Sequence, residues 1–201
     1  MGRAPALTQE QIDNLDRYQK YRLRSMRPVE ELIAHVLQAL DQTGRLGNTY
    51  LFFTSDNGLL MGQHRIVANK RSCYEEAIRV PLMVRGPGVR VGATGGVVSN
   101  IDLAPTFLDL AGVPIPGSVD GRSFVPLLRG EEPEDRDVLS VWHASGVTAA
   151  LRTPRWAYIE NETSEIELYD MEADPYQLES LHWDADPALL QDLHDRTQAL
   201  L

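Results

Sequence analysis

The feature that most constrains the fold is a helical apolar pattern that leads within a few residues into an uninterrupted apolar run. Residues 29–44 read VEELIAHVLQALDQTG, and their apolar side chains recur at helical spacing: Leu32, Ile33, Val36, Leu37 and Leu40. Residues 50–53 are all apolar without alternation, which is typical of a strand buried on both faces of a parallel sheet. A helix and such a strand, joined by a short turn, predict an α/β fold.

Further elements of this first part follow the same logic. Residues 8–27 are rich in helix-forming residues and predict an earlier helix, which Pro28 is expected to separate from the one above. A second apolar strand is predicted at 80–86, before a Gly-Pro-Gly turn, and another helix at 99–113. These elements extend the α/β pattern.

A charged, proline-containing segment at 130–137 marks the expected boundary between two domains, 1–135 and 136–201. Beyond it the chain carries short strand-like runs separated by turns, which predict a small antiparallel sheet. The tail from 186 to 201 has leucines at helical spacing, so a final helix is expected to pack on that sheet.

Charge and cysteine content exclude some classes of function. The formal charge of -10 and a pI near 4.9 disfavour binding to nucleic acid, because an acidic surface repels phosphates. No run approaches the roughly 18 apolar residues of a membrane span, so no membrane contact is expected. The N-terminus lacks the apolar core of a signal peptide, and Cys73 is the one cysteine, so the chain as it stands fits a reducing, cytoplasmic compartment.

Four polar residues that follow the 50–53 strand carry the chemistry of a candidate site. Asp56 and Asn57 offer a charged and a neutral oxygen, which suit a hard cation such as Ca²⁺ or Mg²⁺. Lys70 could hold an anion, and His64 could exchange a proton near neutral pH. Each residue also has an ordinary interpretation, since Asp-Asn-Gly often only forms a turn and a loop His or Lys is often solvated.

Five ordered blocks of the chain resemble the sulfatase family. They are GRLGNTYLFFTSDNG, GQHRIVANKRSCYEEAIRVPLMVRGPGV, VVSNIDLAPTFLDLAGVPIP, DGRSFVPLLRG and ELYDMEADPYQLESL. The second block is most similar to N-acetylglucosamine-6-sulfatases and related glycan sulfatases.

The resemblance implies a fold and roles for the four residues. The fold would be part of an alkaline-phosphatase-like α/β/α sandwich (residues 1–135), followed by a small α+β subdomain with an antiparallel sheet and a helix. Asp56 and Asn57 match the family's ligands of a divalent cation, usually calcium, and Lys70 matches the lysine that contacts the sulfate group. His64 matches a more variable pocket position and is expected to act near the reacting group.

The sequence departs from the family in lacking its nucleophile. Sulfatases make a formylglycine from Cys or Ser in Cys/Ser-x-Pro/Ala-x-Arg, and no Cys or Ser of this sequence has that context. The chain therefore resembles only the C-terminal portion of a sulfatase, and it is expected to be weakly active or inactive alone, with an incomplete calcium site. Its expected partners are sulfated small molecules or glycans, together with a missing N-terminal half or a homodimer mate.

Two alternatives to a sulfate ester hydrolase remain open from the sequence. The chain could be a non-catalytic remnant that binds a partner or an anionic glycan, with Arg71, Arg79 and Arg85 as anion contacts. It could instead keep the fold and act on phosphate or phosphonate esters.

Overall fold

The computed structural model describes residues 5–143, 147–161 and 163–201, which form two compact units. The first comprises Met1–Lys70 and Arg79–Pro87, and the second comprises Arg71–Ile78 and Gly88–Leu201. The chain therefore passes between the units three times, and the short stretch 71–78 belongs to the second. The predicted domain boundary at 135/136 does not coincide with any of these crossings and stays a prediction. Among the described residues, no helix has the length and apolar character that crossing a bilayer requires.

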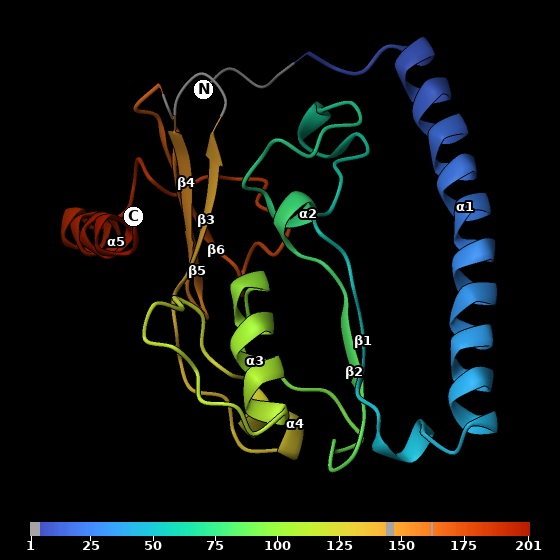
Figure 1. The fold of residues 1–201 in the computed structure, drawn as a ribbon. Helices are drawn as coiled ribbons and strands as arrows, with labels where there is room; N and C mark the ends of the chain where they lie inside the picture. The colour runs from blue at the N-terminus through green and yellow to red at the C-terminus, as the bar shows by residue number, and fades with distance from the viewer. Residues whose placement is uncertain (1–4, 144–146, 162) are drawn as a thin grey trace. The chain divides into compact units, whose positions relative to one another are not determined.

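The first unit begins with one long helix, α1, over Gln9–Gln42 (Figure 1). Thr8 starts it with a capping box: its hydroxyl accepts from the backbone N–H of Gln11, and the Gln11 side chain accepts from the Thr8 N–H. Pro28 lies inside the helix, so the prediction of two separate helices was wrong. Proline removes one hydrogen bond, and the strong helix formers on both sides carry the helix through that position.

Two short strands complete the regular structure of this unit. After the turn η1 (Leu46–Asn48), β1 (Leu51–Thr54) pairs with β2 (Leu82–Arg85), and Leu51 lies opposite Arg85. The pairing is antiparallel and every residue of β1 is half-buried, so the expectation of a fully buried strand in a parallel sheet was wrong here. An apolar run shows that a strand is shielded, but it does not fix the direction of its neighbour.

The turn after β2 depends on a glycine. A Cβ atom at Gly86 would lie 2.1 Å from the Tyr50 ring, so a side chain cannot be placed there. The Tyr50 hydroxyl also donates to the carbonyl of Pro87 at 2.8 Å. Tyr50, at the start of the apolar run, thus fixes the chain where it leaves β2.

The second unit is built on a four-stranded antiparallel meander, which confirms the predicted sheet. Its strands are hydrogen-bonded in the order β3-β4-β5-β6. Their bounds are Val138–His143, Val147–Arg152, Trp156–Glu160 and Ile166–Asp170. The final helix α5 (Pro187–Leu200) packs on the sheet as predicted, with Leu193 buried against Leu151, Tyr158 and Leu168.

A second apolar cluster in this unit involves the stretch 71–78. Cys73 is buried with Ala150, Ile159 and other residues of the sheet, and Tyr74 packs against the cluster. The short helix α2 (Glu75–Ile78) follows directly. Residues 71–78, which lie between β1 and β2 in the sequence, are therefore part of the core built on the C-terminal sheet.

Three short helices complete the second unit: η3 (Asn100–Asp102), α3 (Leu103–Leu110) and α4 (Val125–Arg129). Asp102, at the N-cap position of α3, is fully buried. Its carboxylate accepts from the backbone N–H of Ser99 at 2.7 Å, from that of Arg122 at 2.9 Å, and from Arg136 Nη1 at 2.6 Å. One buried carboxylate thus ties the start of α3 to two loops.

Candidate active site

The loop that leaves β1 carries the predicted acid–amide pair. Asp56 is exposed, and its Oδ1 atom accepts the backbone N–H of Asn57 at 2.9 Å. The Asn57 side chain donates through Nδ2 to the Gly58 carbonyl at 2.7 Å. These local hydrogen bonds use the Asn57 Nδ2 atom and leave its Oδ1 atom for another partner.

That partner is Lys70, whose Nζ atom donates to Asn57 Oδ1 at 3.1 Å. A β-bridge between Leu60 and Asn69 brings the chain back, with hydrogen bonds of 2.8 and 3.2 Å between their backbones. Leu60 is completely buried and anchors the bridge. The structure thus brings together Asn57 and Lys70, which are 13 positions apart, within one compact unit.

His64 lies on the loop between Asn57 and Lys70, in the turn η2 (Gln63–Arg65). Its backbone is left-handed (φ 53°), as is that of Arg65 (φ 60°), and these conformations are uncommon for residues other than glycine. The Gly62 N–H donates to the Ile66 carbonyl at 2.9 Å and closes the turn. The His64 side chain is half-buried, which is compatible with the expected pocket position.

The donors on this loop fit a hard cation in type but not in number. Asp56 and Asn57 offer carboxylate and amide oxygens, which calcium prefers, yet calcium takes about six to eight oxygen ligands. In the described part of the chain, no three His, Cys, Asp or Glu side chains gather in a way that could hold a metal ion. A calcium ion bound here would need most of its ligands from residues outside this chain, from water or from a substrate.

The Tyr-Glu-Glu run after Lys70 has structural partners that the sequence did not reveal. Tyr74 donates to Glu167 Oε2 at 2.9 Å, and Tyr169 donates to the same oxygen. Glu75 pairs with Arg152 at 3.0 Å, and its backbone N–H donates to the Gln177 side chain at 2.7 Å. The run is thus bound to the C-terminal sheet and the loop that follows β6.

Burial changes the acidity of two groups in this region. Burial raises the pKa of the Cys73 thiol to about 11, so the thiol is protonated at neutral pH and is a poor nucleophile. Burial, together with the negative charge of Glu167, raises the pKa of the Tyr74 hydroxyl well above its usual value. Both groups therefore act as neutral parts of the core.

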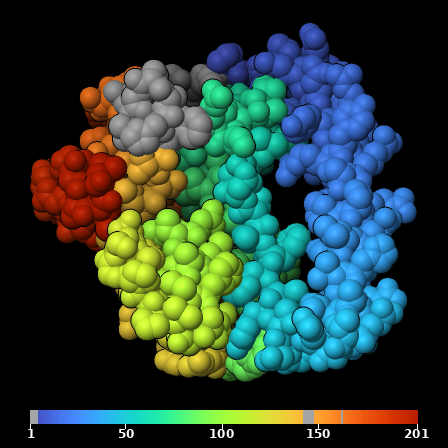
Figure 2. Space-filling model, in the orientation of Figure 1, coloured from blue at the N-terminus to red at the C-terminus, as the bar shows by residue number. Residues whose placement is uncertain are grey.

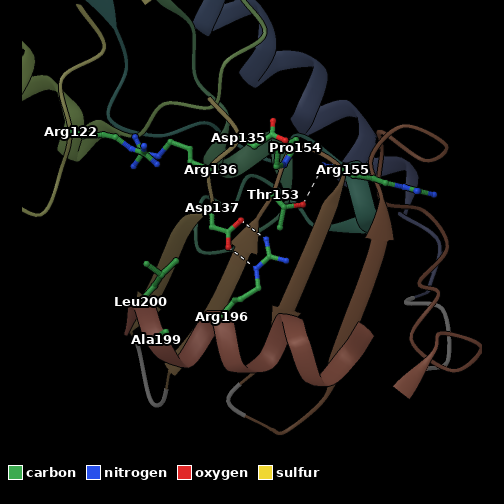
Figure 3. A pocket seen from close by; sticks show the side chains of 10 residues that line it. All are labelled: Arg122, Asp135, Arg136, Asp137, Thr153, Pro154, Arg155, Arg196, Ala199 and Leu200. Carbon is green, nitrogen blue, oxygen red and sulfur yellow. Dashed lines mark hydrogen bonds and ion pairs between the residues drawn. The ribbon is translucent and has the colours of Figure 1, made fainter. Parts of the chain in front are cut away.

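A cavity of about 610 Å³ in the second unit is lined by four arginines, as Figure 3 shows. Each arginine already has a carboxylate partner: Arg122 pairs with Glu134, Arg136 with Asp102, Arg155 with Asp170, and Arg196 with Asp137. Asp135 and Asp137 lie in the cavity wall as well. The local charge is therefore balanced, and the cavity lacks the excess positive charge of an anion site.

Comparison with known proteins identifies the family. The family model for sulfatases matches residues 3–113, and the model for the C-terminal region of N-sulphoglucosamine sulphohydrolase matches residues 62–200. The chain belongs to the sulfatase family. Together the two matches span nearly the whole chain, as the five sequence blocks indicated, and the family's members named among the relatives are sulfuric ester hydrolases.

Individual sulfatases and related enzymes are similar to this chain over only part of their own length. It is 34% identical to N-acetylglucosamine-6-sulfatase of Bos taurus over 87% of this chain and 38% of the bovine protein. The solved structure of BT4656 in complex with its substrate D-glucosamine-2-N,6-O-disulfate superimposes with a TM-score of 0.78 at 31% identity, covering 85% of this chain and 37% of BT4656. Phosphonate monoester hydrolase from Silicibacter pomeroyi gives a TM-score of 0.70 at 29% identity, covering 84% of this chain and 37% of that enzyme.

These likenesses confirm the predicted fold class, a partial sulfatase-type α/β fold, and the chain spans less than two fifths of each of these three proteins. The roles assigned to Asp56, Asn57, His64 and Lys70 rest on the motif match and the local geometry, and they stay predictions.

Proposed function

We propose that this chain forms the C-terminal part of a sulfatase that hydrolyses sulfate esters of amino sugars or aryl alcohols. The contact between Lys70 Nζ and Asn57 Oδ1, 3.1 Å long, carries the proposal. It joins the predicted anion-binding residue to a predicted cation ligand at the end of β1. The named substrate of BT4656, a 2-N,6-O-disulfated glucosamine, supports a sulfated amino sugar as the substrate class.

In this proposal the side chains act on the charge of the ester. The Lys70 ammonium group binds a sulfate oxygen and neutralises charge that increases as the ester bond breaks. Asp56 and Asn57 hold one side of a calcium ion, which would polarise the sulfate group when bound. His64 donates a proton to the leaving ester oxygen.

The nucleophile has to come from residues that this chain lacks. No Cys or Ser in the sequence stands in the Cys/Ser-x-Pro/Ala-x-Arg context from which formylglycine is made. The one cysteine, Cys73, is buried and its raised pKa keeps it protonated. We therefore expect no ester hydrolysis by the 201-residue chain alone.

An assay of hydrolysis tests the proposal. The chain is co-expressed with the residues of BT4656 outside its matched region, and release of sulfate from 6-O-sulfated N-acetylglucosamine and 4-nitrophenyl sulfate is measured. We expect activity from the combined proteins and at least a hundredfold loss with Lys70→Ala, while Lys20→Ala on α1 serves as the matched control. Equal activity of the Lys70→Ala variant would remove that residue from the site.

Calcium binding by the isolated chain tests the cation side separately. Calorimetry is expected to find no site tighter than about millimolar, the weak end of the range for protein calcium sites, because two side chains supply too few ligands. A micromolar site that disappears with Asp56→Ala would show that the chain holds calcium by itself, contrary to the proposal.

Phosphonate ester hydrolysis is a second candidate, favoured by the likeness to the Silicibacter enzyme. The same combined protein is assayed with 4-nitrophenyl phenylphosphonate. A higher kcat/KM for the phosphonate than for the aryl sulfate would favour this alternative.

A further inference from the structure

We infer that Asn57 is a modification site, at which the chain converts its own asparagine into aspartate and isoaspartate, and that Ser55 and Lys70 promote this deamidation. The inference goes beyond the proposed function, because the reaction changes the chain itself and needs only water as a co-reactant. It concerns the loop that leaves β1, where the two side chains contact the two groups that react.

Asn57 is the one asparagine of the sequence that a glycine follows. Deamidation begins when the backbone nitrogen of the next residue attacks the side-chain carbon Cγ, and glycine hinders this attack least because it has no Cβ atom. Glycine also gives the backbone the freedom that closing a small ring requires. The other asparagines are each followed by a residue with a side chain: Asn14, Asn48, Asn69, Asn100 and Asn161.

The reaction takes place in two covalent steps. The Gly58 nitrogen gives up its proton and forms a bond to Asn57 Cγ, the bond from Cγ to Nδ2 breaks, and the amide group leaves with the proton as ammonia. Water then opens the resulting succinimide ring at one of its two carbonyl carbons. Opening at Cγ gives aspartate in the normal backbone, whereas opening at the backbone carbonyl carbon leaves the backbone running through the side chain as isoaspartate.

Lys70 is placed to make the amide carbon more reactive. Its Nζ atom donates at 3.1 Å to Asn57 Oδ1, the oxygen on which negative charge develops when Cγ is attacked. A donor fixed on such an oxygen lowers the barrier by stabilising that charge. Because Lys70 is exposed, we expect a several-fold acceleration, well below the roughly hundred- to thousandfold effect of a donor in a site that excludes water.

Ser55 is placed to favour the reactive form of the attacking nitrogen. When the Gly58 nitrogen loses its proton, the charge is shared with the Asn57 carbonyl oxygen of the same peptide group. The Ser55 hydroxyl donates to that oxygen at 3.0 Å, whereas Asp56 Oδ1 is 3.4 Å away. Within the described residues the Gly58 N–H donates to no acceptor, so no hydrogen bond has to break before it reacts.

The Asn57 side chain is already directed towards Gly58. Its Nδ2 atom donates to the Gly58 carbonyl at 2.7 Å, which holds the side chain along the backbone segment that contains the attacking nitrogen. Groups held next to each other react without the full entropic cost of being brought together. Both residues are half-buried, and Figure 2 shows atoms of this cyan segment at the surface, so water reaches the loop for the second step.

The product would change the charge next to Lys70. An aspartate at position 57 places a carboxylate where Lys70 now contacts an amide oxygen, and the ammonium group would form a charge-assisted hydrogen bond with it. Lys70 would then be less available to a sulfate oxygen. This consequence rests on the proposed function, whereas the deamidation itself does not.

The test measures the modification directly, without an assay of activity. The 201-residue chain is kept in warm neutral buffer. Peptide mass spectrometry then measures the amide-to-acid mass increase at each asparagine, and labelling by isoaspartyl methyltransferase measures isoaspartate. We expect Asn57 to react before every other asparagine, and hydroxylamine, which cleaves succinimides, to cut the chain between 57 and 58. An Asn57 that stays an amide for as long as the other asparagines would overturn the inference.

Variants separate the contribution of the two contacts from that of the Asn-Gly pair alone. Lys70→Ala is expected to slow deamidation about three- to tenfold and Ser55→Ala about two- to fivefold, while Lys70→Arg keeps a donor and most of the rate. Lys20→Ala and Ser25→Ala, at exposed positions of α1, are the matched controls and should react at the parent rate. Unchanged or faster deamidation in both site variants, with circular dichroism like that of the parent, would contradict the promoting roles.

A different product would identify Lys70 as the nucleophile. If its amine attacked Asn57 Cγ, ammonia would again be lost, but an isopeptide bond would join the two side chains. Peptide mapping detects such a crosslink, and hydroxylamine would not cut the chain between 57 and 58. That result would overturn the inference.

The outcome is separable from that of the proposed function. Deamidation of the chain with no ester hydrolysis by the combined proteins would support the modification site and contradict the hydrolase, and a stable Asn57 in an active complex would do the reverse. In an active complex, Asn57→Asp should lower hydrolysis about tenfold, since the new carboxylate competes with the substrate for Lys70. Full activity of that variant would contradict the expected consequence.

Discussion

Tyr74 and Glu167 are 93 positions apart in the sequence and share a hydrogen bond of 2.9 Å between the phenol and a buried carboxylate. Tyr169 donates to the same oxygen, and Asn161 donates to the other carboxylate oxygen at 3.0 Å. Three neutral donors thus stabilise a buried carboxylate on β6. The contact links the Tyr-Glu-Glu run of the family motif to the fold of the second unit.

Removing one donor from this group should lower stability measurably. For Tyr74→Phe we expect a loss of about 1–3 kcal/mol in the free energy of unfolding, since the bond is to a charged group and the buried carboxylate loses a partner. Urea denaturation measures the change. Tyr176→Phe, at an exposed tyrosine, is the control. An unchanged midpoint for Tyr74→Phe would show that water or another donor replaces the phenol.

Because Cys73 is buried, we expect the free energy of unfolding to decrease at alkaline pH. Burial raises its pKa from 9.0 to about 11, so the native thiol keeps its proton where the unfolded thiol loses it. The stabilisation is fully present below pH 9 and is lost as the pH rises from 9 to 11, amounting to roughly 2–3 kcal/mol at about 1.4 kcal/mol per pKa unit. Denaturation midpoints between pH 8 and 10 measure it. Cys73→Ala should flatten the curve in that range, and an equally steep curve in this variant would assign the effect to other groups.

Arg136 is expected to matter because of the charge that it neutralises. Asp102 is fully buried, and Arg136 lies 2.6 Å from its carboxylate. Arg136→Leu would leave that charge without its cation, at a cost of about 3–5 kcal/mol. The double variant Arg136→Leu with Asp102→Asn should recover part of the loss. Calorimetric unfolding of the two proteins checks this, and a double variant less stable than the single one would contradict the explanation.

We expect the pKa of His194 to be higher than that of an ordinary histidine. Its Nδ1 atom lies 2.5 Å from Glu160, and this hydrogen bond and the carboxylate charge raise its pKa. The resulting stabilisation is present below the usual histidine pKa of about 6.5 and is lost as the pH rises through the raised value. NMR titration of the ring should show the raised pKa, and Glu160→Gln should bring it back towards the usual value.

Sequence patterns predicted where strands and helices lie, but not the contacts that depend on residues far away in the sequence. The short strand-like runs after 137 predicted the strands of the meander, and the leucines of the tail predicted that α5 packs on it. The apolar run at 50–53 predicted β1 but not its direction, since pairing depends on a distant strand. The proline at 28 suggested a break that the helix formers around it overcome.

The site was predictable in its chemistry and only partly in its structure. Asp56, Asn57 and Lys70 stood out as residue types that bind cations and anions, and the structure joins two of them through the Leu60–Asn69 bridge. No residue pattern indicated that Glu167 accepts a hydrogen bond from Tyr74, because a single buried carboxylate produces no periodic pattern in the sequence. Contacts of this kind depend on the tertiary fold.

The passage of residues 71–78 into the second unit sets a limit on how the protein can be dissected. A recombinant fragment that starts at Gly88 would contain all four strands of the meander but would lack Cys73 and Tyr74. The apolar cluster that these two residues form with the sheet would then be incomplete and partly exposed to water. A well-behaved fragment should begin no later than Arg71, and it then has to carry the β2 sequence as a loose insertion. During synthesis, likewise, residues 71–78 can form their native contacts only after β6 has been made, because Tyr74 binds Glu167 of that strand.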